Sequence, residues 1–310
     1  MTAHYPAGGT LGAEEGIPLP GTAALIEQLT SEHGPSASLD IMTAPASGRP
    51  RTPVGVDAGK PNAARLWNYL LGGKDNYGVD QQVAERMRAV APDMRRAAWY
   101  SRRFLLKAVE DAAKAGIRQF IDIGAGIPLS TGGNDPHDVA EKIQPGVSFT
   151  AIDYDPMVFV HCNAMYNHTP STTTVKADIR DPDAVINKLR MRGMVDFTQP
   201  TAVLMVGVLD YVTDDEDPAG IMARLRAALA PGSYLALTHA SSGTCRDLMA
   251  RIDADTVGST AESVWRTSEE IDEFLDGFNV LRPGLPPVQA WLDGELRPTR
   301  LETLAAVGRV

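Results

Sequence analysis

The sequence predicts an α/β fold in which a doubly wound, mostly parallel sheet carries helices on both faces and follows an N-terminal helical extension. After residue 117, apolar runs of strand length alternate with amphipathic stretches of helix length. This alternation is typical of a parallel sheet that is covered on both sides. The connections between the runs are long enough for the right-handed crossovers that parallel strands require.

The chain is predicted to divide into three parts. Residues 1–56 are rich in Gly, Pro, Ala, Ser and Thr, and they offer too little apolar surface to offset the entropy of ordering them. We therefore expect a disordered leader there. Residues 57–116 are expected to form a helical lid, and residues 117–310 the main ligand-binding domain.

Three helices are predicted before the sheet, at residues 61–71, 79–91 and 94–115. Pro61 suits the first turn of the first helix, and Pro92 ends the second. The polar residues 74–78 follow Gly72-Gly73 and separate the first two helices.

Five strands and the helices between them are expected to build the parallel sheet. The strands are predicted at residues 119–123, 147–153, 173–177, 202–206 and 233–238, and the helices at 138–143, 156–165, 183–191 and 218–230. Two more helices, at 244–254 and 268–275, precede three short segments at 279–282, 288–291 and 301–310. We expect the last two segments to pair as antiparallel strands at one edge of the sheet.

Composition excludes several classes of partner. The formal net charge of −10 provides no basic surface, so nucleic acid is not an expected partner. The chain has only two cysteines, Cys162 and Cys245, and they are far apart in the sequence, which indicates a reducing cytoplasm. No residues show metal-ligand spacing, so no metal site is expected. The N-terminus does not resemble a signal peptide. No apolar stretch approaches the length of roughly 20 residues that a membrane span requires. We expect a cytoplasmic protein without a membrane partner.

Small or acidic residues follow the predicted strands. In a doubly wound sheet, ligands bind beyond the carboxyl ends of the strands. Eight residues at these ends are predicted to bind one cofactor: Asp122, Gly124, Gly126, Asp153, Tyr154, Asp178, Ile179 and Gly207. Each acid could instead cap a loop, and Asp155 before Pro156 resembles a helix N-cap.

The stretch FIDIGAGIP, residues 120–128, distinguishes between two nucleotide cofactors. A nicotinamide dinucleotide site has a third glycine, but Leu129 stands in its place. Asp122 at the strand tip would also repel a diphosphate. An acid there suits a cationic amino-acid group, and Asp153 can accept both hydroxyl protons of a ribose. With Asp178 accepting from an adenine amine and Ile179 packing on its ring, the pattern indicates S-adenosylmethionine.

Residues from about 56 onward resemble a bacterial family of S-adenosylmethionine-dependent methyltransferases that is largely uncharacterised. The motifs that carry the resemblance are PNAARLWNYLLGGKDNYGVD, FIDIGAGIP, AIDYDP, VKADIRDP and AVLMVGVLDYV, and GGKDNY is the most specific of them. The resemblance covers roughly four-fifths of the chain. It implies a class I methyltransferase-like fold, with Asp122, Gly124 and Gly126 as the methionine-side loop and Asp153 as the ribose ligand.

The sequence departs from the family pattern at two places. The loop after Pro128 is longer than the family's compact form, and Asp210 stands where family members usually have histidine. The second departure puts in doubt any role of that histidine in binding the acceptor. Neither departure touches the cofactor assignment.

Three residues are candidates for the catalytic side of the site. Tyr77 could belong to a lid over the cofactor, or simply to a turn between helices. Asp210 follows the fourth strand, where it could face the acceptor or be a solvated acid. His239 follows the fifth strand and could face the pocket or be a structural histidine.

The sequence thus predicts a methyltransferase that uses S-adenosylmethionine and transfers the methyl group in line to a small-molecule acceptor. A catalytically inactive module that binds the same cofactor remains an alternative, because acceptor-side groups are sparse. A nicotinamide-dependent reductase is a second alternative, which Asp122 and the missing glycine oppose. The sequence gives no indication of the oligomeric state.

Overall fold

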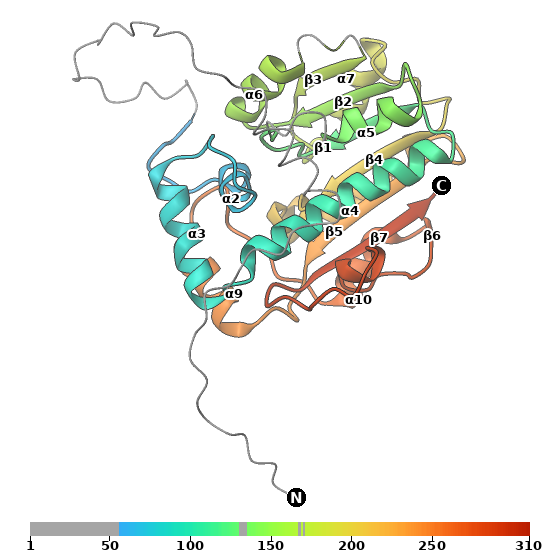
Figure 1. Ribbon diagram of the computed structural model, residues 1–310. Coiled ribbons are helices and arrows are strands. Elements are labelled where there is room, and N and C mark those ends of the chain that lie inside the picture. The colour runs from blue at the N-terminus through green and yellow to red at the C-terminus, as the bar shows by residue number, and fades with distance from the viewer. Residues whose placement is uncertain (1–55, 130–134, 167–168, 170) are drawn as a thin grey trace, which may run out of the picture. The chain divides into compact units, whose positions relative to one another are not determined.

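Seven strands form a single sheet in the computed structural model, which describes residues 56–310 except 130–134, 167–168 and 170 (Figure 1). The strand order is β3-β2-β1-β4-β5-β7-β6. The strands are β1 (Gln119–Ile123), β2 (Ser148–Asp153), β3 (Thr172–Lys176), β4 (Thr201–Val206), β5 (Tyr234–Ala240), β6 (Asn279–Val280) and β7 (Thr303–Arg309). The first five are parallel, and β7 runs antiparallel to both β5 and β6. The predicted doubly wound, mostly parallel sheet is confirmed.

The winding starts in the middle of the sheet. From β1 the chain moves outward through β2 to β3, and it then returns to β4 on the other side of β1. The strand order therefore reverses between β1 and β4, and the crevice outside the carboxyl ends of these two strands is where ligands bind in such sheets.

Helices cover both faces of the sheet, as the sequence predicts. The α-helices are α2 (Ala63–Leu70), α3 (Gly78–Val90), α4 (Met94–Lys114), α5 (Pro136–Ile143), α6 (Pro156–Tyr166), α7 (Pro182–Met191), α8 (Pro218–Ala228), α9 (Arg246–Thr256) and α10 (Ser268–Asp272). Short 3₁₀ turns are η1 (Leu209–Tyr211), η2 (Asp214–Glu216), η3 (Glu273–Leu275) and η4 (Val288–Trp291).

Alternation along β1 assigns its side chains to the two faces. Phe120 packs in the core beneath α4 and α5, whereas Ile121 and Ile123 pack in the core beneath α7 and α8. Because successive side chains of a strand point to opposite faces, Asp122 shares the face of Phe120 and of α4.

The N-terminal helices are held by a helix from far along the chain. Leu66, Val83 and Met87 pack in a third apolar cluster with Leu248 and Ile252 of α9. Figure 1 shows α2 and α3 beside α9, at the end of the sheet where the chain leaves β5. This packing places α2 next to the carboxyl ends of the strands.

The expected pairing of residues 288–291 with 301–310 is wrong. Residues 288–291 form the turn η4, and β7 pairs with β5 and β6 instead. Pro286 and Pro287 precede the turn and have no backbone N–H to offer a ladder, so the only β-bridge between this described segment and β7 joins Pro287 and Leu304. The segment is also held to β7 by two hydrogen bonds with Ala305, one to the carbonyl of Pro286 and one from the indole N–H of Trp291. The predicted leader, apart from Val56, lies outside the described residues.

Candidate functional site

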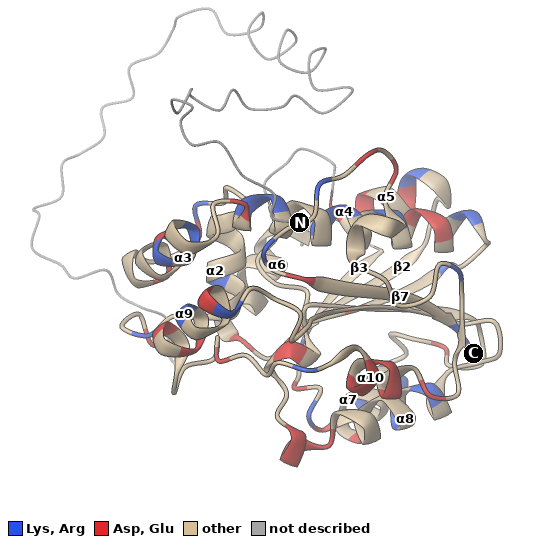
Figure 2. Cartoon of the chain, turned by 90° about the horizontal axis from the view of Figure 1, so that it is seen from below, with Lys and Arg blue, Asp and Glu red and all other residues tan. Residues whose placement is uncertain are grey.

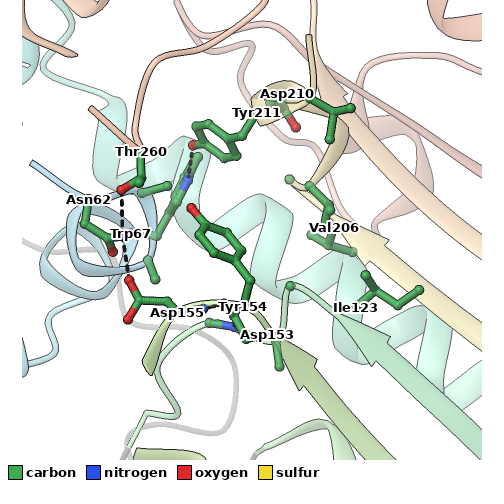
Figure 3. Close-up of a pocket in the computed structure, with 18 of the residues that line it drawn as sticks. Asn62, Trp67, Ile123, Asp153, Tyr154, Asp155, Val206, Asp210, Tyr211 and Thr260 are labelled. Atoms are coloured by element: carbon green, nitrogen blue, oxygen red, sulfur yellow. Dashed lines mark hydrogen bonds between the residues drawn. The ribbon is translucent and has the colours of Figure 1, made fainter. Parts of the chain in front are cut away.

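A cavity of about 460 Å³ opens at the carboxyl ends of the parallel strands (Figure 3). All eight predicted cofactor residues line it, and so does Asp210; Tyr77 and His239 do not. The cavity is completed by residues from α2, from α4 and from residues 259–264.

The loop after β1 owes its shape to its two glycines. Gly124 and Gly126 have φ angles of 67° and 66°, which side chains rarely tolerate. A Cβ atom on Gly124 would lie 2.7 Å from Cγ2 of Val208, so the loop after β4 packs directly on the glycine loop. Glycine is therefore needed at position 124 both for its backbone angle and for this close packing.

The backbone amides of the glycine loop are already engaged within the protein. The N–H groups of Gly124 and Ala125 donate to the carbonyl of Ile152 at 2.8 and 3.1 Å, and that of Gly126 donates to Asp153 at 3.1 Å. A dinucleotide loop keeps such amides free for the pyrophosphate. This arrangement opposes a nicotinamide cofactor more directly than the missing third glycine does.

Asp153 ends β2 as a buried, oriented carboxylate. Its Oδ1 accepts from the N–H of Asp155 at 2.9 Å, while its Oδ2 accepts from Gly126. Burial raises the pKa of Asp153 to about 6, although these hydrogen bonds oppose the rise. Each oxygen keeps a second lone pair, so the carboxylate can accept further hydrogen bonds from a diol.

Asp122 faces α4, and the guanidinium of Arg102, which the sequence did not predict as part of the site, acts on it. Burial raises the pKa of Asp122 to about 7, with the guanidinium of Arg102 opposing the rise. Arg102 lines the cavity and forms an ion pair with Asp135. Ala98, Ser101 and Leu105 line the cavity from the same face of α4, and this helical spacing was the available signal.

Tyr154, Asp178 and Arg180 form one wall of the cavity. The Arg180 guanidinium lies 5.3 Å from the centre of the Tyr154 ring and pairs with Asp178 at 2.6 Å and Glu216 at 3.1 Å. Burial acts to raise the pKa of Asp178, but the hydrogen bonds from Arg180 outweigh it and the pKa is lowered. If Asp178 accepts from the adenine amine as predicted, its carboxylate would bind the amine and Arg180 at the same time.

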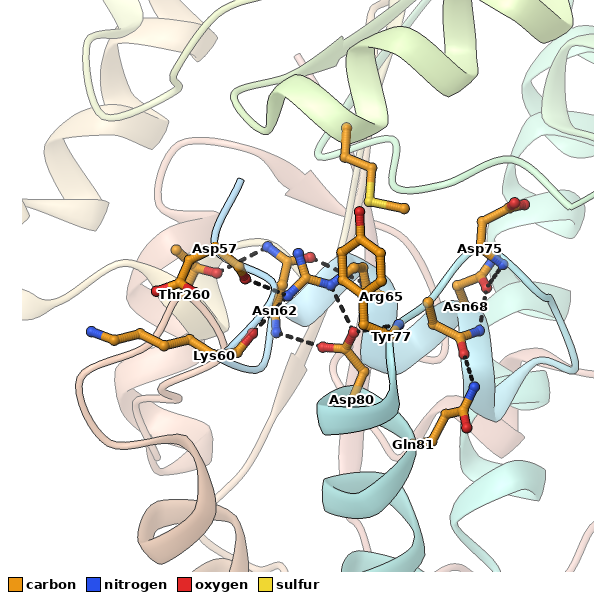
Figure 4. A network of polar contacts seen from close by, with 12 residues as sticks. Asp57, Lys60, Asn62, Arg65, Asn68, Asp75, Tyr77, Asp80, Gln81 and Thr260 are labelled. Carbon is orange, nitrogen blue, oxygen red and sulfur yellow. Dashed lines mark hydrogen bonds and ion pairs between the residues drawn. The ribbon is translucent and has the colours of Figure 1, made fainter. Parts of the chain in front are cut away.

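A polar network fixes the start of α2 beside the cavity (Figure 4). The side-chain amide of Asn62 donates to Asp155 at 2.8 Å and to Thr260 at 2.9 Å, which joins three segments that are distant in sequence. Asp155 also caps α6 by accepting from the N–H of Met157 at 2.7 Å, as its place before Pro156 predicts. Below this contact, Asp80 pairs with Arg65 at 2.7 Å in a fully buried ion pair.

Tyr77 belongs to this supporting network and not to the cavity, which does not support the predicted catalytic role. It is the N-cap residue before α3. Its N–H donates to Asp80 at 2.9 Å, and its ring lies under Arg65 at 4.9 Å. Asn68 accepts from the backbone of Asp75 and the side chain of Asn76. The GGKDNY stretch therefore builds the turn between α2 and α3.

The wall opposite the glycine loop combines an aromatic pair with a buried acid. The indole N–H of Trp67 donates to the hydroxyl oxygen of Tyr211 at 2.9 Å, and Figure 3 shows both rings at the cavity. Burial raises the pKa of Tyr211, so its hydroxyl stays neutral. Asp210 is buried beside it in η1, and its carbonyl accepts from the N–H of Val264 at 2.7 Å.

His239 points to the other side of the sheet, which does not support its predicted role in the pocket. Its neighbours Thr238 and Ala240 line the cavity, so alternation along β5 turns His239 away. The fully buried ring contacts the carbonyl of Ala240 through Nδ1 at 2.7 Å and Arg266 through Nε2 at 2.9 Å. Since Arg266 can only donate, Nε2 is the acceptor and Nδ1 carries the proton.

Arg266 and His239 support the cavity wall from behind. The guanidinium of Arg266 donates to the carbonyls of Leu209 and Val212 at 2.9 and 2.7 Å. These bonds hold both ends of the turn that carries Asp210 and Tyr211. No local pattern predicts this support, because Arg266 lies 56 residues after Asp210.

Within the described residues, no group of three or more His, Cys, Asp or Glu residues is arranged to hold a metal ion. None of the described helices is long and apolar enough to cross a membrane. In Figure 2, basic and acidic residues are interspersed on the helices α3, α4 and α5.

Comparison with known proteins agrees with this geometry. The family model described as S-adenosyl methyltransferase matches residues 50–310. The chain belongs to the S-adenosyl methyltransferase family. A DUF574 family protein from Streptomyces avermitilis MA-4680 is 30% identical, with a TM-score of 0.76 over 82% of this chain and 98% of that one. A protein from Thermobifida fusca YX, described as a candidate methyltransferase, is 33% identical, with a TM-score of 0.73 over 81% of this chain and 95% of that one.

A comparison with curated protein sequences found no match. The family and the strand order together confirm the class I methyltransferase-like fold. The chain is thus a methyltransferase that depends on S-adenosylmethionine, and a nicotinamide-dependent reductase is not supported.

Proposed function

We propose that this methyltransferase binds S-adenosylmethionine along the ends of β1, β2 and β3 and transfers its methyl group in line to a small-molecule acceptor. The acceptor enters the same cavity from the side of Trp67 and Asp210. The observation that carries the proposal is the Asp153 carboxylate, which the amides of Gly126 and Asp155 hold in the cavity with lone pairs to spare.

The cofactor residues divide by the part of the molecule they suit. Asp153 accepts from the ribose hydroxyls, Tyr154 and Ile179 pack against the adenine, and Asp178 accepts from its amine. Asp122 pairs with the ammonium group of the methionine portion. Arg102 lies on this side of the cavity and pairs with Asp135. The methionine carboxylate would approach its guanidinium group.

The glycine positions fit a ligand that lies close to the backbone. Nothing lies within 4 Å of a Cβ atom placed on Gly207, which lines the cavity with a φ of 68°. A side chain there would enter the space that the ligand needs. When bound, the cofactor supplies an electrophilic methyl group on a sulfonium, so the protein needs to position the acceptor and exclude water.

We further propose that residues 57–116 act as the lid of the site. Asn62, Trp67 and Asn68 of this segment line the cavity, and Asn62 is tied to Asp155 at the end of β2. The two free cysteines, Cys162 and Cys245, fit a cytoplasmic setting. The described residues form no basic face that would mark a nucleic-acid substrate, and the site lies within a cavity, so a small acceptor is favoured.

The test is transfer of labelled methyl from S-adenosylmethionine into a low-molecular-weight extract of the cells that make the protein. We expect a labelled small molecule that disappears when Asp153→Ala replaces the wild-type protein. Label in protein or nucleic acid alone would contradict the small-molecule assignment. Binding of the cofactor without any label transfer would contradict the proposed turnover.

A further inference from the structure

Asp210 carries a carboxylate oxygen that lacks a partner. The residue is 5% exposed and lines the cavity. Its Oδ1 accepts from the N–H of Ala240 at 2.6 Å, whereas Oδ2 has no hydrogen-bond partner within the described part of the chain. A buried polar atom left in this state is costly, so the geometry is suited to a ligand that brings a donor.

The position of Asp210 is next to the predicted transfer site. It lies two residues after Val208, whose side chain packs against Gly124 of the glycine loop. The turn η1 that carries it is fixed from behind by Arg266. A group held by Asp210 would therefore lie between this rigid turn and the loop assigned to the methionine portion.

The surfaces beside Asp210 are aromatic and electron-rich. Trp67 and Tyr211 line the cavity and are locked together by their hydrogen bond. The faces of such rings attract cations and pack well against apolar groups. Figure 3 shows Tyr154 pointing its ring toward the same space.

The charge of the cavity wall has one dominant sign. Seven aspartates and glutamates line it, against two arginines and no lysine or histidine. Both arginines already pair with carboxylates, Arg102 with Asp135 and Arg180 with Asp178 and Glu216. The wall would attract a cationic acceptor and repel a carboxylate or phosphate.

We propose that the methyl acceptor is a small amine with an apolar or aromatic body, whose nitrogen is held by the free oxygen of Asp210. The body lies against Trp67 and Tyr211. This inference rests on the proposed function and names the acceptor class for the same cavity.

The reaction balances with the groups present. An ammonium group that enters the site gives one proton to the Asp210 carboxylate and becomes a neutral amine. Its lone pair then forms the new N–CH₃ bond while the S–CH₃ bond breaks and leaves its electron pair on sulfur. The product leaves as an N-methylammonium ion, and the protonated Asp210 returns its proton to solvent.

The experiment uses full-length protein saturated with S-adenosylhomocysteine, which fills the cofactor site without a transferable methyl group. Calorimetry compares three sets of probes that differ only in the polar group: 2-phenylethylamine, 2-phenylethanol and phenylacetate; tryptamine, tryptophol and indole-3-acetate; hexylamine, hexanol and hexanoate. We expect the amine to bind about tenfold or more tightly than its alcohol in at least one set, with the carboxylate weakest.

The variant Asp210→Asn tests whether this carboxylate is responsible. Its remaining oxygen can still accept from Ala240, so the turn should keep its shape. We expect S-adenosylhomocysteine to bind as before while the preference for the amine is lost. Asp215→Asn, an equivalent change at an exposed acid, should keep the preference.

The outcomes separate the two proposals. Failure of the wild-type protein to bind S-adenosylhomocysteine would contradict the proposed function itself. With that binding intact, an alcohol or carboxylate that binds best, the absence of any amine preference, or a preference that persists in Asp210→Asn would each overturn the amine assignment.

Discussion

The wall of the cavity that we assign to the cofactor and the wall that we assign to the acceptor are built in different ways. The first lies at the ends of β1, β2 and β3, and its residues fall between Asp122 and Arg180 in successive strand–helix units. The second draws Trp67, Asp210 and Thr260 from α2, η1 and the segment after α9, across almost 200 residues. One wall is specified by local strand ends, and the other by the packing of distant segments.

The two walls also differ in what holds their side chains. Asp153 is oriented by backbone amides of its own and the neighbouring loop. The acceptor wall depends on side chains, through Arg266 and His239 behind η1 and Asn62 at the rim. Changes at the first wall should therefore affect cofactor affinity, and changes at the second should affect transfer or the kinetics of binding.

The largest effect is expected for Asp153→Ala. Loss of two charge-assisted hydrogen bonds to the ribose should weaken S-adenosylhomocysteine binding by about a hundredfold or more. Titration calorimetry measures this change, with circular dichroism to show that the sheet is intact. Asp183→Ala, at a side chain that is 70% exposed on α7, should bind like wild type. If Asp153→Ala binds S-adenosylhomocysteine within threefold of wild type, the assignment of Asp153 to the cofactor would be wrong.

The next largest effect is the pH dependence of cofactor affinity. The pKa of Asp122 is raised to about 7 and that of Asp153 to about 6. In our proposal the ionised carboxylates bind the ligand, so affinity should be highest near pH 8 and fall as the two groups protonate, by up to about tenfold per pH unit for each group. Titrations of S-adenosylmethionine from pH 8 to 5.5 measure it. Asp122→Asn should bind more weakly at pH 8 and lose the part of the slope near pH 7; an unchanged slope would show that Asp122 does not titrate with binding.

Trp67→Ala should separate the walls by lowering transfer while cofactor affinity stays within threefold of wild type. Truncating an aromatic anchor typically weakens binding of its partner by about tenfold or more, and the extract assay would show this as a slower initial rate. Trp67→Phe keeps a ring and should retain most of the rate. Loss of cofactor binding in Trp67→Ala would mean that the tryptophan belongs to the first wall.

The smallest effect is expected at the rim. Asn62→Ala removes the N-cap of α2 and the links to Asp155 and Thr260, which should cost about 1–2 kcal/mol of stability and speed cofactor release severalfold. Thermal unfolding and stopped-flow displacement measure the two quantities. Gln81→Ala, which removes a side-chain hydrogen bond to Asn76 on the same helical segment, should leave release unchanged. Equal release rates in both variants would argue against a lid.

The sequence predicted which residues of the first wall line the cavity, because these residues stand at the ends of the predicted strands. Asp122, Asp153 and Asp178 stand at strand ends, where period-two apolar runs stop, and the parallel sheet brings such ends together. The second wall depends on which side of a strand or helix faces the cavity. Thr238 lies in the wall, and its neighbour His239 on β5 lies behind it. The predicted bounds of a strand do not determine which of two successive side chains faces the cavity.

The same limit explains the other differences. The place of Tyr77 before the sheet and the family resemblance of GGKDNY predict a lid residue, but the hydrogen bonds of this turn run inward to Asp80 and Asn68. Arg102 stands in an amphipathic helix that reads as an ordinary packing element. Thr260 lies in a polar segment whose position depends on the docking of α9 against α2 and α3, and no local pattern predicts that docking.

The most direct test is calorimetric titration of the full-length protein with S-adenosylmethionine, S-adenosylhomocysteine and NADH, repeated with Asp153→Ala. We predict one site for each of the first two ligands, no heat from NADH, and loss of both sites in the variant. Binding of NADH, or undiminished binding of S-adenosylhomocysteine by Asp153→Ala, would contradict the assignment of the strand-end wall to the cofactor.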